Sequence, residues 1–196
     1  MKKKILAAFM AATMVAGMSA INVAAEEEGG DLITVGFSQV GAESDWRTAN
    51  TESMQTTFTE ENGYELIFDD AQQKQENQLT AIRNFIQQEV DYILLAPVTE
   101  TGWDTVLQEA KDAGIPVIII DRMVDVSDDS LYTTWIGTDS LLEGRKAAEW
   151  LNAYATAKEI APEDLHIVDI QGTIGSTAQI GRTQGLEEGV EKYGWD

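Results

Sequence analysis

Short apolar runs alternate along the chain with segments in which apolar residues recur every three or four positions. The runs, each typical of a buried strand, are ITVGFSQ, YELIFDDA, DYILLAP, PVIIID, TTWIGTD and LHIVDIQG. Helical faces are predicted by Leu79, Ile82, Phe85, Ile86 and Val90, and by Trp103, Val106, Leu107 and Ala110. Helix ends are predicted at Gly63 and at Gly114 with Pro116. Strands and helices alternate at intervals of roughly 25 to 30 residues, which predicts parallel β-α-β units in a doubly wound α/β fold.

A boundary between two lobes is predicted at MVDVSDDSLYT, residues 123–133, which is polar and acidic and has neither period. We assign residues 33–127 to a first α/β lobe and residues 128–196 to a partial second α/β lobe. The second would hold two strands, a helix over Leu141 to Lys158 and a last helical segment through Leu186 and Val190. The acidic stretch DVSDDS lacks the Gly and the distal Glu of an EF-hand loop, so we interpret it as a solvated linker.

The first residues have the features of a secretory leader. Residues 1–25 begin with three lysines, continue with a short apolar run from Ile5, and end in Val-Ala-Ala, which predicts a signal peptide cleaved after Ala25. A retained membrane anchor is the alternative, but polar and Gly positions interrupt the run. Residues 26–32 then form an acidic and glycine-containing tether. We therefore expect a periplasmic or extracytoplasmic protein, secreted through a cleaved signal peptide.

Charge and residue usage exclude several classes of function. The chain has 13 basic and 34 acidic residues, a net charge of −21, and the leader carries three of the lysines and no acid. So negative a protein is not expected to bind nucleic acid. With no Cys and with His166 as the only histidine, at the start of a predicted strand, nucleophilic triads are disfavoured. GTIGSTAQIGRT fails as a phosphate loop because of its spacing and because Arg182 replaces Lys. No metal or cofactor is predicted.

Charged and aromatic side chains follow the first predicted strand. In parallel sheets, ligands bind at the carboxyl ends of the strands. The stretch SQVGAESDWRTAN places Ser38, Glu43, Trp46 and Arg47 at such an end. Trp46 is either the first buried residue of the following helix or an aromatic platform for a sugar ring whose polar edge meets Arg47 and Glu43.

A second pair, Asp121 and Arg122, ends the strand PVIII. Charges at this edge need partners, because burial without them is costly. The pair is either a structural ion pair or a site at which carboxylate and guanidinium bind adjacent hydroxyls of a polyol. We place Trp135 in the core, and Trp103 fits the apolar face of its helix.

Several segments together resemble a known family. They are FSQVGAESDWR, DDAQQKQENQLTAIRNFI, ILLAPVTETGWDTVLQEAKDAGIPVIIIDR, LLEGRKAAEWL and VDIQGTIGSTAQIGR. From about Ile33 to Gly189 the chain resembles periplasmic sugar-binding proteins of the ribose and galactose type, nearest to the galactofuranose-binding members. The resemblance implies the type I periplasmic-binding-protein fold, in which two lobes close on a monosaccharide. It also implies delivery to the membrane permease of an ATP-driven (ABC) importer, no catalysis, and a monomeric full-length protein.

The resemblance also implies a set of ligand-binding residues. They are Ser38, Glu43, Trp46 and Arg47 after the first strand, Asp121 and Arg122 at the fourth, Asp139 after the crossover, and Arg182 in the second lobe. The family's second lobe continues further than this chain does, so we expect a C-terminally truncated protein. Which sugar binds, galactofuranose-like or ribose-like, stays open.

Two rival functions share the fold class. One is an α/β enzyme acting on sugars or nucleotides with Asp121 as acid or base, although no second catalytic group is evident near it. The other is the sensor domain of a LacI-type transcription regulator, which would need a basic DNA-binding helix-turn-helix at its N-terminus. Here the N-terminus has the pattern of a leader.

Overall fold

A single parallel sheet organises the first part of the computed structural model, which describes residues 31–195. The predicted signal peptide and residues 26–30 of the tether lie outside the described residues. The sheet has the order β2-β1-β3-β4-β5, and every neighbouring pair is parallel. Its strands are β1 (Ile33–Gln39), β2 (Tyr64–Asp70), β3 (Tyr92–Leu95), β4 (Val117–Asp121) and β5 (Thr134–Gly137). The predicted α/β class is confirmed.

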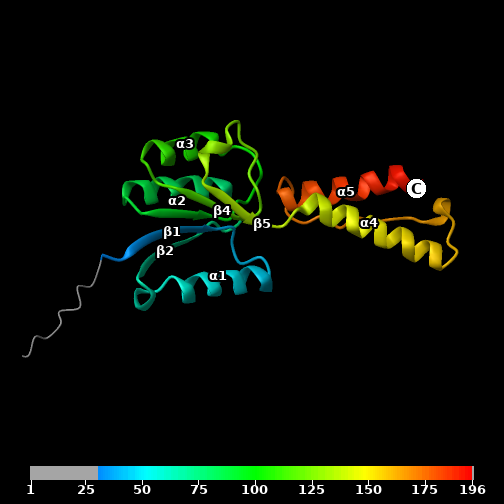
Figure 1. The fold of residues 1–196 in the computed structure, drawn as a ribbon, viewed down its shortest axis with the longest axis horizontal. Helices are drawn as coiled ribbons and strands as arrows, with labels where there is room; N and C mark the ends of the chain where they lie inside the picture. The colour runs from blue at the N-terminus through cyan, green and yellow to red at the C-terminus, as the bar shows by residue number, and fades with distance from the viewer. Residues whose placement is uncertain (1–30, 196) are drawn as a thin grey trace, which may run out of the picture. The chain divides into compact units, whose positions relative to one another are not determined.

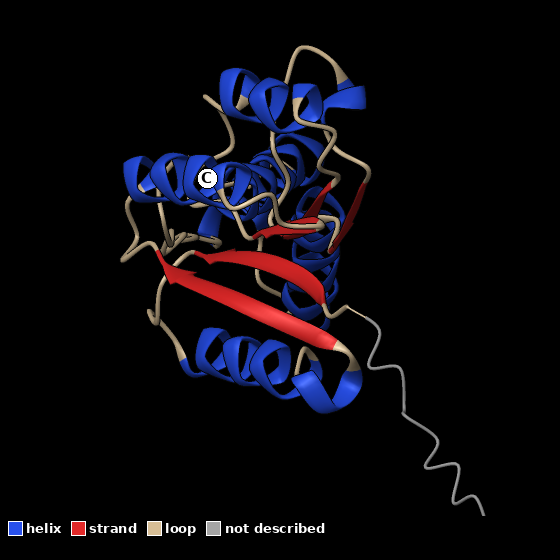
Figure 2. Ribbon diagram, turned by 90° about the vertical axis from the view of Figure 1, so that its left-hand side faces the viewer, coloured by secondary structure: helices blue, strands red, loops and turns tan. Residues whose placement is uncertain are grey.

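Helices cover both faces of this sheet (Figures 1 and 2). They are α1 (Asp45–Thr57) on one face, and α2 (Gln75–Gln87) and α3 (Asp104–Asp112) on the other. Short 3₁₀ helices occur at η1 (Glu60–Asn62), η2 (Asp129–Leu131) and η3 (Pro162–Asp164). The chain continues in α4 (Ser140–Ala157) and α5 (Thr177–Tyr193), which pack against each other. Within the described part of the chain, no helix is long and apolar enough to cross a bilayer.

Local sequence explains where these elements end. Gly63 and Gly114 adopt left-handed φ angles of 86° and 76°, which glycine tolerates without steric cost. Gly63 closes η1, and Gly114 directly follows the last turn of α3. The predicted helix end at Gly114 is confirmed, whereas the first helix, α1, ends at Thr57, before Gly63.

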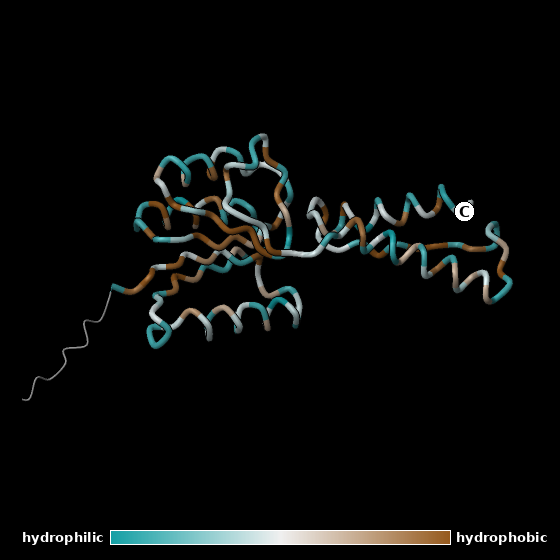
Figure 3. Tube along the Cα trace, in the orientation of Figure 1, coloured by the Kyte–Doolittle hydropathy of each residue, from teal (hydrophilic) through white to brown (hydrophobic). Residues whose placement is uncertain are grey.

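The core has two parts, one on each side of the sheet. Ile82, Phe85 and Leu107 belong to the part under α2 and α3, and Phe37 to the part under α1. Apolar residues concentrate along the strands, as Figure 3 shows. Trp103 is fully buried and its Nε1 donates to the Thr99 carbonyl at 2.8 Å, whereas Trp135 is half-buried against the first part.

Two expectations for the second lobe need correction. The strand in TTWIGTD is β5, and it pairs with β4 in the first sheet (Ile118 opposite Thr134) rather than opening a second sheet. Residues 165–172, LHIVDIQG, form no strand, although this apolar run predicts one. A strand needs a hydrogen-bonded neighbour. In the described residues the five strands pair only among themselves, and Val168 and Ile170 are left 85% and 92% exposed.

Candidate ligand-binding site

The turn between β1 and α1 fixes the position of Arg47. Ser44 is the N-cap of α1, and its side chain accepts a hydrogen bond from the Arg47 amide at 3.2 Å. Arg47 therefore lies in the first turn of the helix, next to the carboxyl ends of the strands. Its side chain is only 3% exposed.

Arg47 joins two separate segments through its guanidinium group. Its Nε donates to Glu43 Oε1 at 3.1 Å, and its Nη2 donates to Asp121 Oδ2 at 2.7 Å. The second contact connects residues 74 positions apart in the sequence. The structure thus brings the predicted residues of the first turn together with those at the end of β4.

Asp121 has an unusual backbone conformation. Its φ of 62° lies in the left-handed region, which non-glycine residues seldom adopt, although Asp is among the most tolerant. The Trp135 indole donates to the Asp121 carbonyl at 3.2 Å. Residues held in sparsely populated backbone regions cluster at functional sites, where the surrounding structure maintains them.

Arg122 completes the cluster. Its Nη1 donates to the Val98 carbonyl at 3.2 Å and its Nη2 to Thr173 Oγ1 at 3.4 Å. The same Nη2 lies 3.7 Å from Glu43 Oε1. Burial lowers the pKa of Arg122, and the positive charge of Arg47 lowers it further, while Asp121 and Glu43 oppose this effect. The two guanidinium groups therefore share one electrostatic environment.

Some polar atoms of the site have unused hydrogen-bonding capacity. Ser38 Oγ and Arg47 Nη1 are buried and find no hydrogen-bond partner among residues 31–195. Buried polar atoms are nearly always paired, and an exception calls for an explanation.

Trp46 does not belong to the core. It is 57% exposed, and the Arg47 guanidinium carbon lies 4.9 Å from the centre of its ring. The alternative that Trp46 is the first buried residue of its helix is therefore wrong. An exposed indole beside a charged cluster is available for stacking on a ring.

The two predicted residues from the second part of the chain differ in their placement. Asp139 is the N-cap of α4, and its carboxylate accepts from the Leu142 amide at 2.9 Å, which is a structural role. Arg182 is 55% exposed and pairs with Glu143 at 2.9 Å. It also lines a cavity of about 140 Å³ together with Arg122 and Thr173. The ligand roles of both residues stay predictions.

Two buried glutamines that were not predicted as site residues hold this edge of the sheet. Gln78, on α2, donates to the Ala96 carbonyl at 2.7 Å and accepts from the Val98 amide at 2.8 Å. Gln39 donates to Asn50 Oδ1 at 2.9 Å. A signal for Gln78 was present, because it shares the helical period of the apolar residues Ile82 and Phe85, where a polar side chain needs internal partners.

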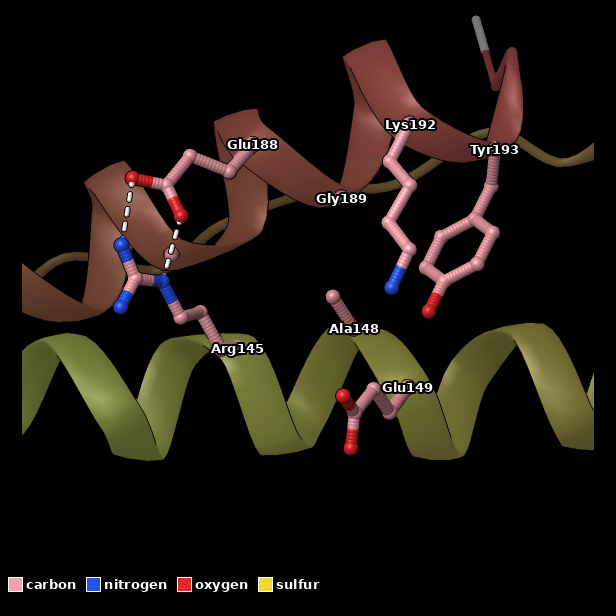
Figure 4. A pocket seen from close by; sticks show the side chains of 8 residues that line it. Arg145, Ala148, Glu149, Glu188, Gly189, Lys192 and Tyr193 are labelled. Atoms are coloured by element: carbon pink, nitrogen blue, oxygen red, sulfur yellow. Dashed lines mark hydrogen bonds and ion pairs between the residues drawn. The ribbon is translucent and has the colours of Figure 1, made fainter.

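A different cavity, of about 150 Å³, lies between α4 and α5 (Figure 4). Arg145 on α4 forms a bidentate pair with Glu188 on α5 at 2.6 and 3.1 Å. Lys192 and Tyr193 lie at its other end. None of the predicted ligand residues lines it, so we do not connect it with the site.

Comparison with known proteins places these observations in a family. A family model described as a periplasmic binding protein domain matches residues 35–196. The chain is 46% identical over 159 residues to the galactofuranose-binding protein YtfQ of Escherichia coli (strain K12), which covers 81% of this chain and 48% of that protein. The chain spans about half the length of the curated relatives it matches.

Solved structures that are similar to this chain include proteins with bound sugars. A protein of Mycobacterium smegmatis in complex with β-D-fucofuranose is similar with a TM-score of 0.75 and 51% identity, over 82% of this chain and 51% of that one. The periplasmic component of an arabinose ABC transporter from Shewanella sp. ANA-3, bound to arabinofuranose, gives a TM-score of 0.73 and 48% identity, over 82% and 51% of the two chains.

Proposed function

Because the chain belongs to the periplasmic binding protein family, we propose that it is part of an extracytoplasmic protein that binds a monosaccharide for an ABC importer. In this proposal the sugar is held in a cleft between two lobes and handed to a membrane permease without chemical change. The first lobe contains the sheet β1–β5, and the second begins with α4. The leader directs the protein out of the cytoplasm.

The observation that carries the proposal is the cluster of Glu43, Arg47, Asp121 and Arg122. It gathers carboxylates and guanidinium groups at the carboxyl ends of β1 and β4, where α/β sheets bind their ligands. Planar guanidinium groups donate two parallel hydrogen bonds and carboxylates accept them, which suits the adjacent hydroxyls of a sugar. Trp46 supplies an aromatic face beside them.

The relatives indicate the class of sugar. They are a galactofuranose-binding protein and proteins in complex with fucofuranose and arabinofuranose, all sugars with five-membered rings. We extend this to the present chain and propose a furanose as its ligand. Its ring would stack on Trp46 while its hydroxyls engage Asp121 and Arg122.

The test is a calorimetric titration of the 196-residue chain, without its leader, against galactose, arabinose, ribose and glucose. We expect heat with at least one furanose-forming sugar and a loss of at least tenfold in affinity for Asp121→Asn. The exposed Asp164→Asn is the matched control and should bind like the wild type.

Two results would contradict the proposal. Equal affinity of the wild type and Asp121→Asn would remove the cluster from the site. Conversion of a sugar during incubation, detected by chromatography, would favour the rival of an α/β enzyme.

A further inference from the structure

The cluster at the carboxyl edge of the sheet is balanced in formal charge. Arg47 and Arg122 contribute two positive charges, and Glu43 and Asp121 contribute two negative charges. One oxygen, Glu43 Oε1, lies 3.1 Å from Arg47 Nε and 3.7 Å from Arg122 Nη2. Glu43 is thus the carboxylate that contacts both guanidinium groups.

The arginines have little access to water with which to screen their charges. The side chain of Arg47 is 3% exposed, that of Arg122 11% and that of Glu43 18%. Interactions between such poorly solvated charges are strong and only weakly screened by salt. The effect of Arg47 on the pKa of Arg122 indicates that the two cations repel each other. Without Glu43, the cluster would carry a net positive charge.

We propose that Glu43 is a specificity-determining residue that makes the site select uncharged sugars over sugar acids. This inference rests on the proposed function and assigns Glu43 a role other than direct contact with the sugar. By neutralising the guanidinium groups from the side of the β1–α1 turn, Glu43 removes their attraction for a ligand carboxylate. Removing its charge would favour a uronate, because the cluster would then carry a net positive charge that attracts the ligand carboxylate.

A role of Glu43 in specificity can be distinguished from a purely structural role of its ion pairs with Arg47 and Arg122. If Glu43 only stabilised the fold, its loss would lower the melting temperature and weaken all sugars alike. If it sets specificity, its loss changes the ratio of affinities between a neutral and an anionic sugar. Glu43→Gln is the informative change because the amide oxygen can still accept a hydrogen bond while the charge is gone.

The experiment compares the wild type with Glu43→Gln and with Glu52→Gln by titration with D-galactose and D-galacturonate. Glu52 is exposed on α1, so its substitution changes the net charge equally, away from the guanidinium groups. We expect the affinity ratio of galacturonate to galactose to rise at least tenfold in Glu43→Gln and to stay constant in Glu52→Gln. Glu43→Asp, which keeps the charge, should retain the preference for galactose.

Each outcome decides the inference. An unchanged ratio in Glu43→Gln overturns it, as does an equal rise in Glu52→Gln or the absence of galacturonate binding in all variants. If the wild type binds no galactose but Glu43→Gln binds galacturonate, the inference holds while galactose binding by this chain fails. If circular dichroism shows that Glu43→Gln is unfolded, Glu43→Ala replaces it as the charge-removing variant, and the same criteria apply.

Discussion

Replacing Arg47 by Met tests whether the cluster is an interdependent buried network. Met is unbranched and apolar, so it can fill part of the space left by the side chain while removing the charge and every donor. The carboxylates of Glu43 and Asp121 would lose hydrogen bonds of 3.1 and 2.7 Å. The substitution therefore leaves two poorly solvated anions with less compensation.

The size of the effect follows from burial. Removing one partner of a buried ion pair costs about 3 to 5 kcal/mol, because the remaining charge is left uncompensated. The Glu43 and Asp121 side chains are 18% and 24% exposed, and Arg122 remains near Glu43. We therefore expect the lower end, a loss of about 3 kcal/mol in the free energy of unfolding. At a urea dependence of about 2 kcal/mol per molar, the midpoint should fall by about 1.5 M.

The assay is urea unfolding followed by circular dichroism, with Arg83→Met as the matched control. Arg83 also forms a bidentate pair, with Glu109 at 2.7 and 2.9 Å, but the two side chains are 45% and 39% exposed. Pairs in water contribute little, so this variant should unfold like the wild type.

Two outcomes would refute the reasoning. If Arg47→Met and Arg83→Met shift the midpoint equally, burial does not decide the strength of these pairs. If Arg47→Met is as stable as the wild type, the carboxylates find other partners, and the cluster is not the interdependent network that the geometry indicates.

Three further predictions address the site and the helix pair. Trp46→Ala should weaken sugar binding by about 1 to 3 kcal/mol and leave the melting temperature unchanged, because an exposed indole contributes contact area to the ligand rather than to the core. A large fall in melting temperature with intact affinity would contradict this. Arg122→Lys should lose affinity, because an ammonium group lacks the planar fork, and calorimetric affinity within twofold of wild type would disprove it. Gly185→Ala should destabilise the packing of α4 on α5 by about 1 to 3 kcal/mol, because the added Cβ would lie 2.5 Å from the Arg145 backbone nitrogen. Gly172→Ala, which has open space around it, is the control and should leave the melting temperature unchanged. Equal melting temperatures of the two variants would refute this prediction.

In two segments after β4, contacts with other strands decided what the local sequence pattern could not. TTWIGTD has the pattern of a strand, and nothing in its sequence tells which sheet it joins; it pairs with β4 because it extends the existing edge. LHIVDIQG is an apolar run like those of the five strands, yet it forms no strand among the described residues. Its backbone groups depend on a neighbouring strand that no local pattern can supply.

The sequence by itself determined the alternation of strands and helices, the helix end at Gly114, and the placing of Asp121 and Arg122 at a strand's carboxyl end. These follow from residue periodicity and backbone preferences, which act over a few neighbouring positions. Only the tertiary structure decided that Arg47 reaches Asp121 across 74 positions and that Trp46 faces solvent. Such contacts depend on how strands are ordered in the sheet, and that order is set by the packing of both faces together.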